Sequence, residues 1–292
     1  MPKKVKRKIL TSVIGFLIVT AGMIALNYPY LSGVMNELFS YREVIEYEQV
    51  FENTGIDETS EKLERAHAYN EALSSGGNLE SFSDFELVQE GSFIGYVDVP
   101  QIGVYGALRY SVSEKVLKQG LGLIEKTSLP VGGPSTHAVI SGHTGMASKK
   151  VLTDLTQMKV GDIFFMHVLG ENIAYQVDKI VIVEPWDTSG LAIVTGEDRV
   201  TLLTCTPYGV NDHRLLVCGV RIEYDFTEPM YEEAKQQEPR VSDVERIRIY
   251  IAIGSGVIYG VFVMYLIVDC ITEVSNYKKK KRKEAANAEA DL

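Results

Sequence analysis

The hydrophobic positions of this 292-residue chain are concentrated in two long uninterrupted stretches, one near each end. Ile9 to Leu26 is 18 residues without a charge, and Ile249 to Val268 is 20. About 20 apolar residues in a helix are enough to cross the hydrocarbon core of a bilayer. The pattern therefore predicts one membrane-spanning helix over 9–26 and a second over 249–268.

Basic residues flank the outer side of both stretches. Five lie between Lys3 and Lys8, and six form the run Lys278–Lys283. Because segments rich in Lys and Arg remain in the cytoplasm, we expect the N-terminus, 1–8, and the tail, 269–292, to be cytoplasmic. The chain between the spans is then extracellular, and the protein is predicted to be a two-span protein of the cell membrane, in contact with membrane lipid.

Each stretch has a competing interpretation. The first is also compatible with a secretory signal peptide, although a signal usually has a shorter apolar run, and Ala21-Gly22-Met23 is a weak cleavage pattern. The second is also compatible with a buried core helix. Its uninterrupted apolarity and its flank of six basic residues favour a span.

Between the spans the hydrophobic pattern changes once. Residues 36–73 repeat apolar positions at helical spacing, which predicts a helical stalk within an extracellular segment, 27–92. Ser74-Ser75-Gly76-Gly77-Asn78 interrupts it. From Phe93 onward, short β-rich runs alternate with turn residues, which predicts a closed barrel over 93–226 and a linker over 227–248. The expected strands are 93–97, 138–141, 161–168, 172–183, 200–204 and 215–224.

Charge separates the middle of the chain from its ends. The whole chain carries 29 Lys+Arg and 39 Asp+Glu, a net charge of −10. Without the eleven basic residues of the two ends and the three acidic residues of the tail, the remainder has 18 basic and 36 acidic residues, a net charge of −18. This argues against a nucleic-acid partner. Cationic substrates are one explanation of the acidity, and solubility outside the cell is another.

Three cysteines provide no disulfide framework. Cys270 falls at the cytoplasmic end of the second span. Cys205 and Cys218 lie on the same side of the membrane, so a bond between them is a possible arrangement, but Cys218 sits within a strand where a free cysteine is common. No CxxC or His/Cys spacing indicates a metal site, and no cofactor is expected.

Cys205 carries the strongest chemical signal in the chain. It ends the strand-like run 200–204 and is followed by turn residues and then by Arg214, which opens the next apolar run. The two runs predict a hairpin in which a thiol and a guanidinium meet at the mouth. A cation in this position lowers the pKa of a thiol and stabilises developing negative charge.

Five histidines compete for the role of general acid and base. His143 is preferred because it follows an apolar strand and lies between Gly142 and Gly145, in the kind of exposed loop that carries catalytic groups. His213 is its rival beside Arg214, although strand alternation directs the two side chains apart. The other three are not expected to act in catalysis. His137 begins a strand and is expected at the surface, His67 lies on the stalk, and His167 lies in an alternating strand, where a half-buried structural histidine is expected.

These motifs resemble those of a known family. Ser141-Gly142-His143-Thr144-Gly145 and the run from Thr201 to Val217, TLLTCTPYGVNDHRLLV, are similar to the motifs of sortases, the cysteine transpeptidases of Gram-positive cell surfaces. The run is most similar to class C, the sortases that assemble pili. The resemblance extends loosely from Phe93 to Tyr224, whereas 31–91 matches only in its helical character.

The resemblance implies a mainly β protein, a closed sortase-type barrel of about eight strands with short helices in its connections. It implies cleavage of an LPxTG-like sorting signal between Thr and Gly and transfer to a lysine amine of a pilin subunit. Cys205 is then the nucleophile, His143 the general acid and base, and Arg214 the group that stabilises the oxyanion. The resemblance also implies that the hydroxyl of Thr204 supports the thioester or the substrate carbonyl.

The sequence departs from the class C pattern before the barrel. Class C enzymes usually have a lid with an Asp-Pro-aromatic tripeptide that covers the active site. Ser83-Asp84-Phe85 retains the acid and the ring without the proline, so Asp84 and Phe85 form either a degenerate lid or an exposed connector. Asp212 and Cys218 stand where the family more often has a small polar and a basic residue.

Other functions remain compatible with the residues. A sortase of this kind can instead anchor surface proteins to the peptidoglycan of the cell wall. A membrane-tethered cysteine protease would release its product to water without an amine acceptor, and a surface binding domain would have no catalysis. The residue types alone do not decide between water and an amine as the second nucleophile.

Overall fold

The computed structural model describes residues 3–53, 56–145, 151–226 and 243–290. They form two compact units. One contains residues 1–31 and 244–292, and the other contains 32–243. Most of the predicted linker, 227–248, lies outside the described residues.

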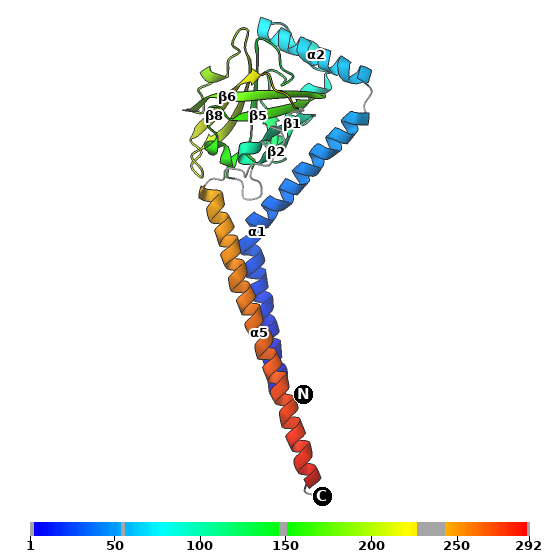
Figure 1. The fold of residues 1–292 in the computed structure, drawn as a ribbon, viewed down its shortest axis with the longest axis vertical. Coiled ribbons are helices and arrows are strands. Elements are labelled where there is room, and N and C mark those ends of the chain that lie inside the picture. The colour runs from blue at the N-terminus through cyan, green and yellow to red at the C-terminus, as the bar shows by residue number, and fades with distance from the viewer. Residues whose placement is uncertain (1–2, 54–55, 146–150, 227–242, 291–292) are drawn as a thin grey trace. The chain divides into compact units, whose positions relative to one another are not determined.

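The first unit is a pair of long helices. The N-terminal part of α1 (Lys3–Asn53) and α5 (Asp243–Ala290) lie side by side (Figure 1). Two polar contacts join them within their apolar surfaces: Thr20 Oγ1 lies 2.8 Å from Tyr259 OH, and Ser255 Oγ donates to Asn27 Oδ1 at 3.1 Å. Residues 5–28 and 246–283 are long and apolar enough to cross a membrane, and they include both predicted spans.

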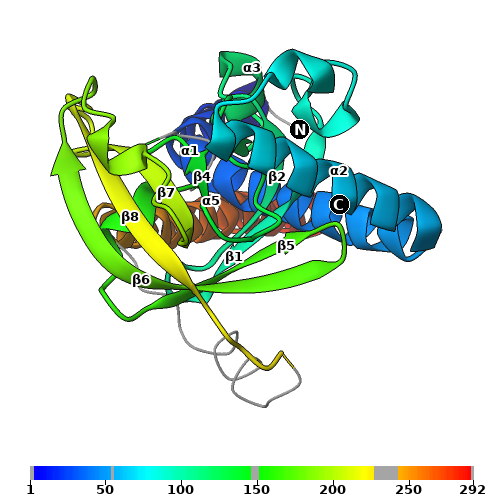
Figure 2. The ribbon, with the colours of Figure 1, turned by 90° about the horizontal axis from the view of Figure 1, so that it is seen from above.

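The second unit is built around a closed eight-stranded barrel, which confirms the predicted fold class. Its strands are β1 (Phe93–Val99), β2 (Val104–Tyr110), β3 (Leu121–Leu123), β4 (Thr136–Ser141), β5 (Ile163–Val168), β6 (Glu171–Val183), β7 (Asp198–Thr206) and β8 (His213–Ile222). They close in the order β1-β2-β3-β4-β7-β8-β6-β5. The pairs β2–β3 and β4–β7 are parallel, and the other pairs are antiparallel. Figure 2 shows the long strands β6 and β8 curving together round the barrel.

All six expected strands are present. The sequence pattern does not indicate β2 and β3, because Gly106 interrupts the first and the second has only three residues. Short helices occupy the connections: α3 (Glu114–Leu117) and the 3-10 helices η3 (Pro100–Ile102), η4 (Thr153–Gln157) and η5 (Ser189–Leu191).

The barrel interior is filled by large apolar side chains. Phe164, Tyr175, Ile140 and Leu202 are completely buried. Burial of each such side chain contributes about 1.5–3 kcal/mol relative to exposure. The strands are therefore held in register by their inward faces, since a slip of one residue would turn these side chains to solvent.

The segment predicted as a stalk packs against the barrel instead of standing free. α2 (Ile56–Ser75) crosses one side of it (Figure 1) and buries Ala66 and Tyr69. Asn70 on this helix forms two hydrogen bonds with the backbone of Leu129, donating to its carbonyl at 2.8 Å and accepting from its N–H at 2.7 Å. The 3-10 helices η1 (Leu79–Phe82) and η2 (Glu86–Val88) connect α2 to β1.

The C-terminal part of α1 also contacts the barrel. Tyr47 stacks on Phe93 with ring centroids 4.6 Å apart, and its hydroxyl accepts the Leu169 N–H at 3.2 Å. The Tyr96 hydroxyl donates to Glu48 at 2.6 Å. These contacts attach the helix that follows the first apolar stretch to β1 and to the β5–β6 turn.

Replacement of Asn70 tests whether α2 is a structural part of the barrel. Asn70→Ala leaves a buried N–H and C=O of Leu129 without their partner, and each such loss costs roughly 1–3 kcal/mol. We expect a loss of about 2 kcal/mol and a fall in melting temperature of about 4–8 °C, followed by near-ultraviolet circular dichroism. The exposed neighbour on the same helix gives the control, because Glu71→Ala should change the melting temperature little. Equal melting of both variants would contradict the bracing role of Asn70.

Candidate active site

The β7–β8 hairpin places a thiol opposite a guanidinium. Cys205 and Arg214 are direct partners in the antiparallel register. Leu202 on β7 and Leu215 and Val217 on β8 belong to the core, so alternation puts Cys205 and Arg214 together on the outer face. Directly opposed residues have Cα atoms about 4.5–5.5 Å apart. Both residues are half-buried.

The parallel pairing of β4 with β7 brings a histidine to the other side of the thiol. Ser141 on β4 pairs with Leu203 on β7. His143 comes two residues after the first, and Cys205 comes two residues after the second. Because neighbouring strands run about 4.8 Å apart, the register aligns His143, Cys205 and Arg214 across three adjacent chain segments. The register thus places the three residues that the sequence selected on neighbouring segments at one end of the barrel.

Two hydrogen bonds hold the chain before His143 against β7. The Gly142 N–H donates to the Leu203 carbonyl at 3.1 Å, and the buried Thr204 hydroxyl donates to the Gly142 carbonyl at 2.7 Å. Thr204 lies on the opposite strand face from Cys205, so in this structure its hydroxyl positions the histidine loop. Its predicted role toward a substrate carbonyl remains a prediction.

The same loop requires glycine at two positions. A Cβ on Gly142 would lie 2.8 Å from Val151 and 2.9 Å from Leu121 and from Leu152, closer than side chains pack. Gly145 has a φ of +73°, and a Cβ on it would lie 3.0 Å from Tyr208. The chain can therefore approach its neighbours here only because these side chains are absent.

His143 is held through its backbone, because its carbonyl accepts the Leu152 N–H at 3.2 Å. Its ring Nε2 lies 3.8 Å from Oε2 of Glu114 on α3, a separation longer than a hydrogen bond. The side chain keeps 31% of its surface exposed. The imidazole is thus accessible, with a carboxylate facing it.

Arg214 is oriented by the turn that precedes it. Its Nη1 donates to the carbonyls of Asn211 at 3.2 Å and His213 at 3.0 Å. Asn211 adopts the left-handed conformation, with a φ of +63°, which turns its carbonyl toward the guanidinium. The remaining donors of the planar guanidinium keep a fixed orientation at the mouth of the hairpin.

His213 lies on the other face of β8. It pairs with Thr206, and its ring contacts Asp212 at 2.7 Å and Glu184 at 3.7 Å. The hydrogen bond to Asp212 raises the pKa of His213 above its usual value. Its side chain is therefore directed away from that of Arg214, as alternation predicted.

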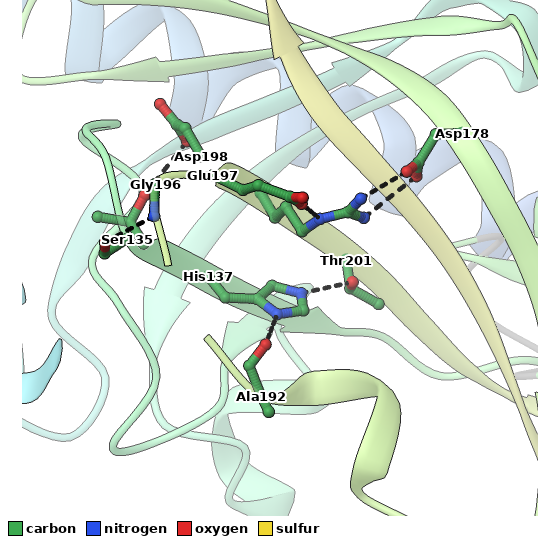
Figure 3. Close-up of polar contacts among 10 residues, drawn as sticks. Ser135, His137, Asp178, Ala192, Gly196, Glu197, Asp198 and Thr201 are labelled. Atoms are coloured by element: carbon green, nitrogen blue, oxygen red, sulfur yellow. Dashed lines mark hydrogen bonds and ion pairs between the residues drawn. The ribbon is translucent and has the colours of Figure 1, made fainter. Parts of the chain in front are cut away.

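The expectation that His137 lies at the surface is wrong. Only 2% of the residue is exposed. Its Nδ1 lies 3.0 Å from the Ala192 carbonyl and its Nε2 lies 2.8 Å from the Thr201 hydroxyl (Figure 3). Burial lowers the pKa of His137 below its usual value, which favours a neutral ring that ties β4 to β7 and to the connection before β7. The sequence missed this because the covering residues are more than 50 positions away.

Cys218 is too far along its strand to pair with Cys205. It lies opposite Thr201, four residues from the level of Cys205. Four residues of strand span about 13 Å, whereas bridged cysteines have Cα atoms about 4.4–6.8 Å apart. Both thiols are free.

The residues considered as a lid are attached to α2. Asp84 forms an ion pair with Arg65, and the same guanidinium lies 4.9 Å from the centre of the Phe85 ring. Phe85 is 2% exposed and belongs to the core, so it is not the exposed connector that was the alternative. These contacts favour a brace between α2 and the barrel over a cover for Cys205.

Two residues beside the site carry no signal in the sequence. Glu114 lies in a short polar helix with no motif, and Tyr208 lies in a turn where its ring was not considered. They come next to the site only in the folded protein, where Glu114 in the β2–β3 connection faces His143 and Tyr208 in the β7–β8 turn contacts Gly145.

Among the residues that the structure describes, no group of three His, Cys, Asp or Glu side chains is arranged to hold a metal ion.

Comparison with known proteins agrees with this geometry. The family model described as the Sortase domain matches residues 97–222. The crystal structure of Clostridium perfringens sortase C with its C-terminal cell wall sorting motif is 38% identical, with a TM-score of 0.61, and the match covers 63% of this chain and 100% of that one. Sortase C of Streptococcus pneumoniae is 41% identical, with a TM-score of 0.57 and coverage of 63% and 97%.

A more distant relative is Sortase A of Bacillus anthracis, 28% identical over 127 residues. That match spans 43% of this chain and 58% of the relative, so this chain covers less than two thirds of the relative's length. A closed barrel with a cysteine, a histidine and an arginine at one rim is the architecture of a sortase. The chain belongs to the sortase family of cysteine transpeptidases, and its structural relatives place it in class C.

The contact between Gly145 and Tyr208 predicts a cost for any side chain at this position. Gly145→Ala adds a methyl group against the ring and forces a left-handed φ that costs about 1 kcal/mol or more. We expect the loop that carries His143 to shift and the alkylation of Cys205 by iodoacetamide at neutral pH to slow about fivefold, since thiol reactivity depends on the nearby cation.

Gly161→Ala is the matched control. Gly161 has a similar left-handed φ of +94°, but a Cβ there meets open space. Adding Tyr208→Ala to Gly145→Ala should restore part of the rate. If Gly161→Ala slowed alkylation as much as Gly145→Ala, the effect would come from backbone strain in general, and the loop contact would have no specific role.

Proposed function

We propose that this protein is a membrane-anchored sortase that cleaves an LPxTG-like sorting signal and transfers the acyl fragment to a lysine amine of a pilin subunit. The observation that carries the proposal is the alignment of Cys205 between Arg214, its partner on β8, and His143, which follows the paired strand β4. Each half of the reaction needs one or more of these three side chains.

The first half is acylation. The Cys205 thiolate attacks the carbonyl carbon of the scissile peptide bond and forms a tetrahedral oxyanion. Arg214 is the group proposed to stabilise that charge, because two backbone carbonyls orient its planar, multidonor guanidinium. The His143 imidazolium protonates the departing amine, and a thioester on Cys205 remains.

The second half decides the class of product. Attack by a lysine amine gives a new amide bond, whereas attack by water gives hydrolysis. The likeness to C. perfringens sortase C, whose structure contains its C-terminal cell wall sorting motif, supports a sorting signal as the acyl donor. The likeness to S. pneumoniae sortase C, whose structure was described for its pilin substrate specificity, supports pilin as the substrate class.

The two apolar helices support a location in the membrane. Residues 5–28 and 246–283 have the length and composition of spans. With basic residues at both outer ends, the positive-inside rule puts both termini in the cytoplasm and the barrel outside. This would give the enzyme access to substrates that are themselves held at the extracellular face of the membrane of a Gram-positive cell.

Anchoring of surface proteins to cell-wall peptidoglycan uses the same acyl-enzyme and a different amine. A tethered protease uses the same thioester and water. Pilin transfer is favoured over both because the class C structures match 63% of this chain, while the sortase A match covers 43% and is less similar.

The nucleophile test compares the two extracellular cysteines. Cys205→Ala should abolish the covalent adduct with a sorting-signal peptide and all transfer to a lysine-bearing acceptor, measured by mass spectrometry of the full-length protein in detergent. Cys218→Ala should retain most activity, because Cys218 lies four positions further along β8 than the site. Loss of activity in a folded Cys218→Ala variant would contradict this assignment. Products released only by water, in the presence of acceptor, would favour the protease.

The topology test uses two reporters. One is fused after Leu292 and the other is inserted in the turn at Gly76-Gly77, between α2 and η1. We expect the reporter after Leu292 to be located in the cytoplasm and the inserted reporter to be located outside the cell. The reason is that the two predicted spans lie on either side of the inserted position. An extracellular C-terminal reporter would overturn the two-span arrangement and leave the enzymatic proposal standing.

A further inference from the structure

The carboxylate of Glu114 lies between the site histidine and a lysine. Its Oε2 is 3.8 Å from His143 Nε2, and its Oε1 is 3.2 Å from the ammonium of Lys118. The Glu114 side chain is 67% exposed, so a second molecule can reach it. α3 is held in place at its start, where Ser113 caps it and donates to Glu90 at 2.8 Å.

Lys118 shows what this carboxylate can hold. A lysine ammonium binds Glu114 while the same carboxylate stays within 3.8 Å of the imidazole. Both partners of the Glu114–Lys118 pair are mostly exposed, and exposed pairs of this spacing contribute only about 0.3–0.5 kcal/mol. An incoming lysine amine can therefore displace Lys118 at little cost.

The proposed transfer has a requirement that the site must meet. A lysine side chain has an unperturbed pKa of about 10.4, so it arrives as an ammonium, which is not a nucleophile. It must lose a proton next to the thioester. A carboxylate attracts the ammonium, and the bound ammonium can still transfer a proton to a neighbouring neutral imidazole. The carboxylate has no comparable attraction for water.

We propose that Glu114 binds the ε-ammonium of the acceptor lysine and presents it to His143; this inference rests on the proposed transpeptidase function. The ammonium gives one proton to neutral His143, and the free amine attacks the thioester carbonyl. The new C–N bond forms, the C–S bond breaks, and Cys205 leaves as a thiolate. The second proton of the attacking nitrogen passes to water. The thiolate and imidazolium that begin the next cycle are then restored.

This role makes Glu114 a determinant of acceptor choice. It favours a primary ammonium over water and over neutral nucleophiles, and it acts after the acyl-enzyme has formed. Loss of its charge should therefore change the partition of the thioester and leave its formation unchanged.

The test uses full-length protein in detergent and a sorting-signal peptide as acyl donor. A lysine-bearing peptide and hydroxylamine, which is neutral at pH 7, are compared as acceptors. Glu114→Gln should lower kcat/KM for the lysine peptide by up to about fivefold, mainly through KM, which is the upper end of what an exposed charge pair contributes. Adduct formation, hydrolysis and reaction with hydroxylamine should stay within about twofold of wild type.

Three further variants sharpen the result. Glu184→Gln is the matched control, because Glu184 is also an exposed carboxylate beside a histidine, 3.7 Å from His213, and it should behave as wild type. Glu114→Asp should retain part of the preference for lysine. Lys118→Ala should lower KM for the lysine peptide, because the internal competitor is removed.

Two outcomes would overturn the inference. If Glu114→Gln slowed lysine peptide and hydroxylamine equally, Glu114 would act only by positioning His143. If it slowed neither, the carboxylate would have no part in the reaction. Absence of any adduct on the wild-type protein would instead overturn the proposed function and this inference with it.

Discussion

The parallel pairing of β4 with β7 is the interaction on which the site depends. It joins segments about 60 residues apart, and its register, Ser141 with Leu203, sets the position of His143 relative to Cys205. The adjacent antiparallel pair then sets Arg214. A slip of one residue in either pair would turn one of the three side chains to the opposite face. The buried side chains on the inner faces of these strands make such a slip costly. The packing of the core therefore also fixes the relative positions of His143, Cys205 and Arg214.

The segment 142–145, which directly follows β4, packs closely against its neighbours. The Gly142 N–H donates to the Leu203 carbonyl, its own carbonyl accepts the Thr204 hydroxyl, and the absence of a side chain leaves room for apolar neighbours. The left-handed Gly145 lets the chain pass the ring of Tyr208. His143 thus lies in a segment held by backbone contacts, and its ring is left accessible. This combination is compatible with the acid and base role proposed for His143.

The helices before the barrel pack against it and support it. Asn70 satisfies both backbone groups of Leu129, and Tyr47 and Glu48 join α1 to the strands. Asp84 and Phe85 complete the brace on α2. Both residues considered as a lid thus make their contacts with α2 and the core.

The sequence by itself determined what depends on local composition. Uninterrupted apolarity marked the two long helices, alternation marked six strands, and the residue types at Cys205, His143 and Arg214 marked the chemistry. It could not place His137 in the interior, pack the segment 56–75 on the barrel or bring Glu114 to His143. Those features depend on contacts between residues far apart in the chain, and the same local pattern is compatible with burial or exposure. Only the tertiary structure decided them, because closure of the barrel determines which surfaces meet.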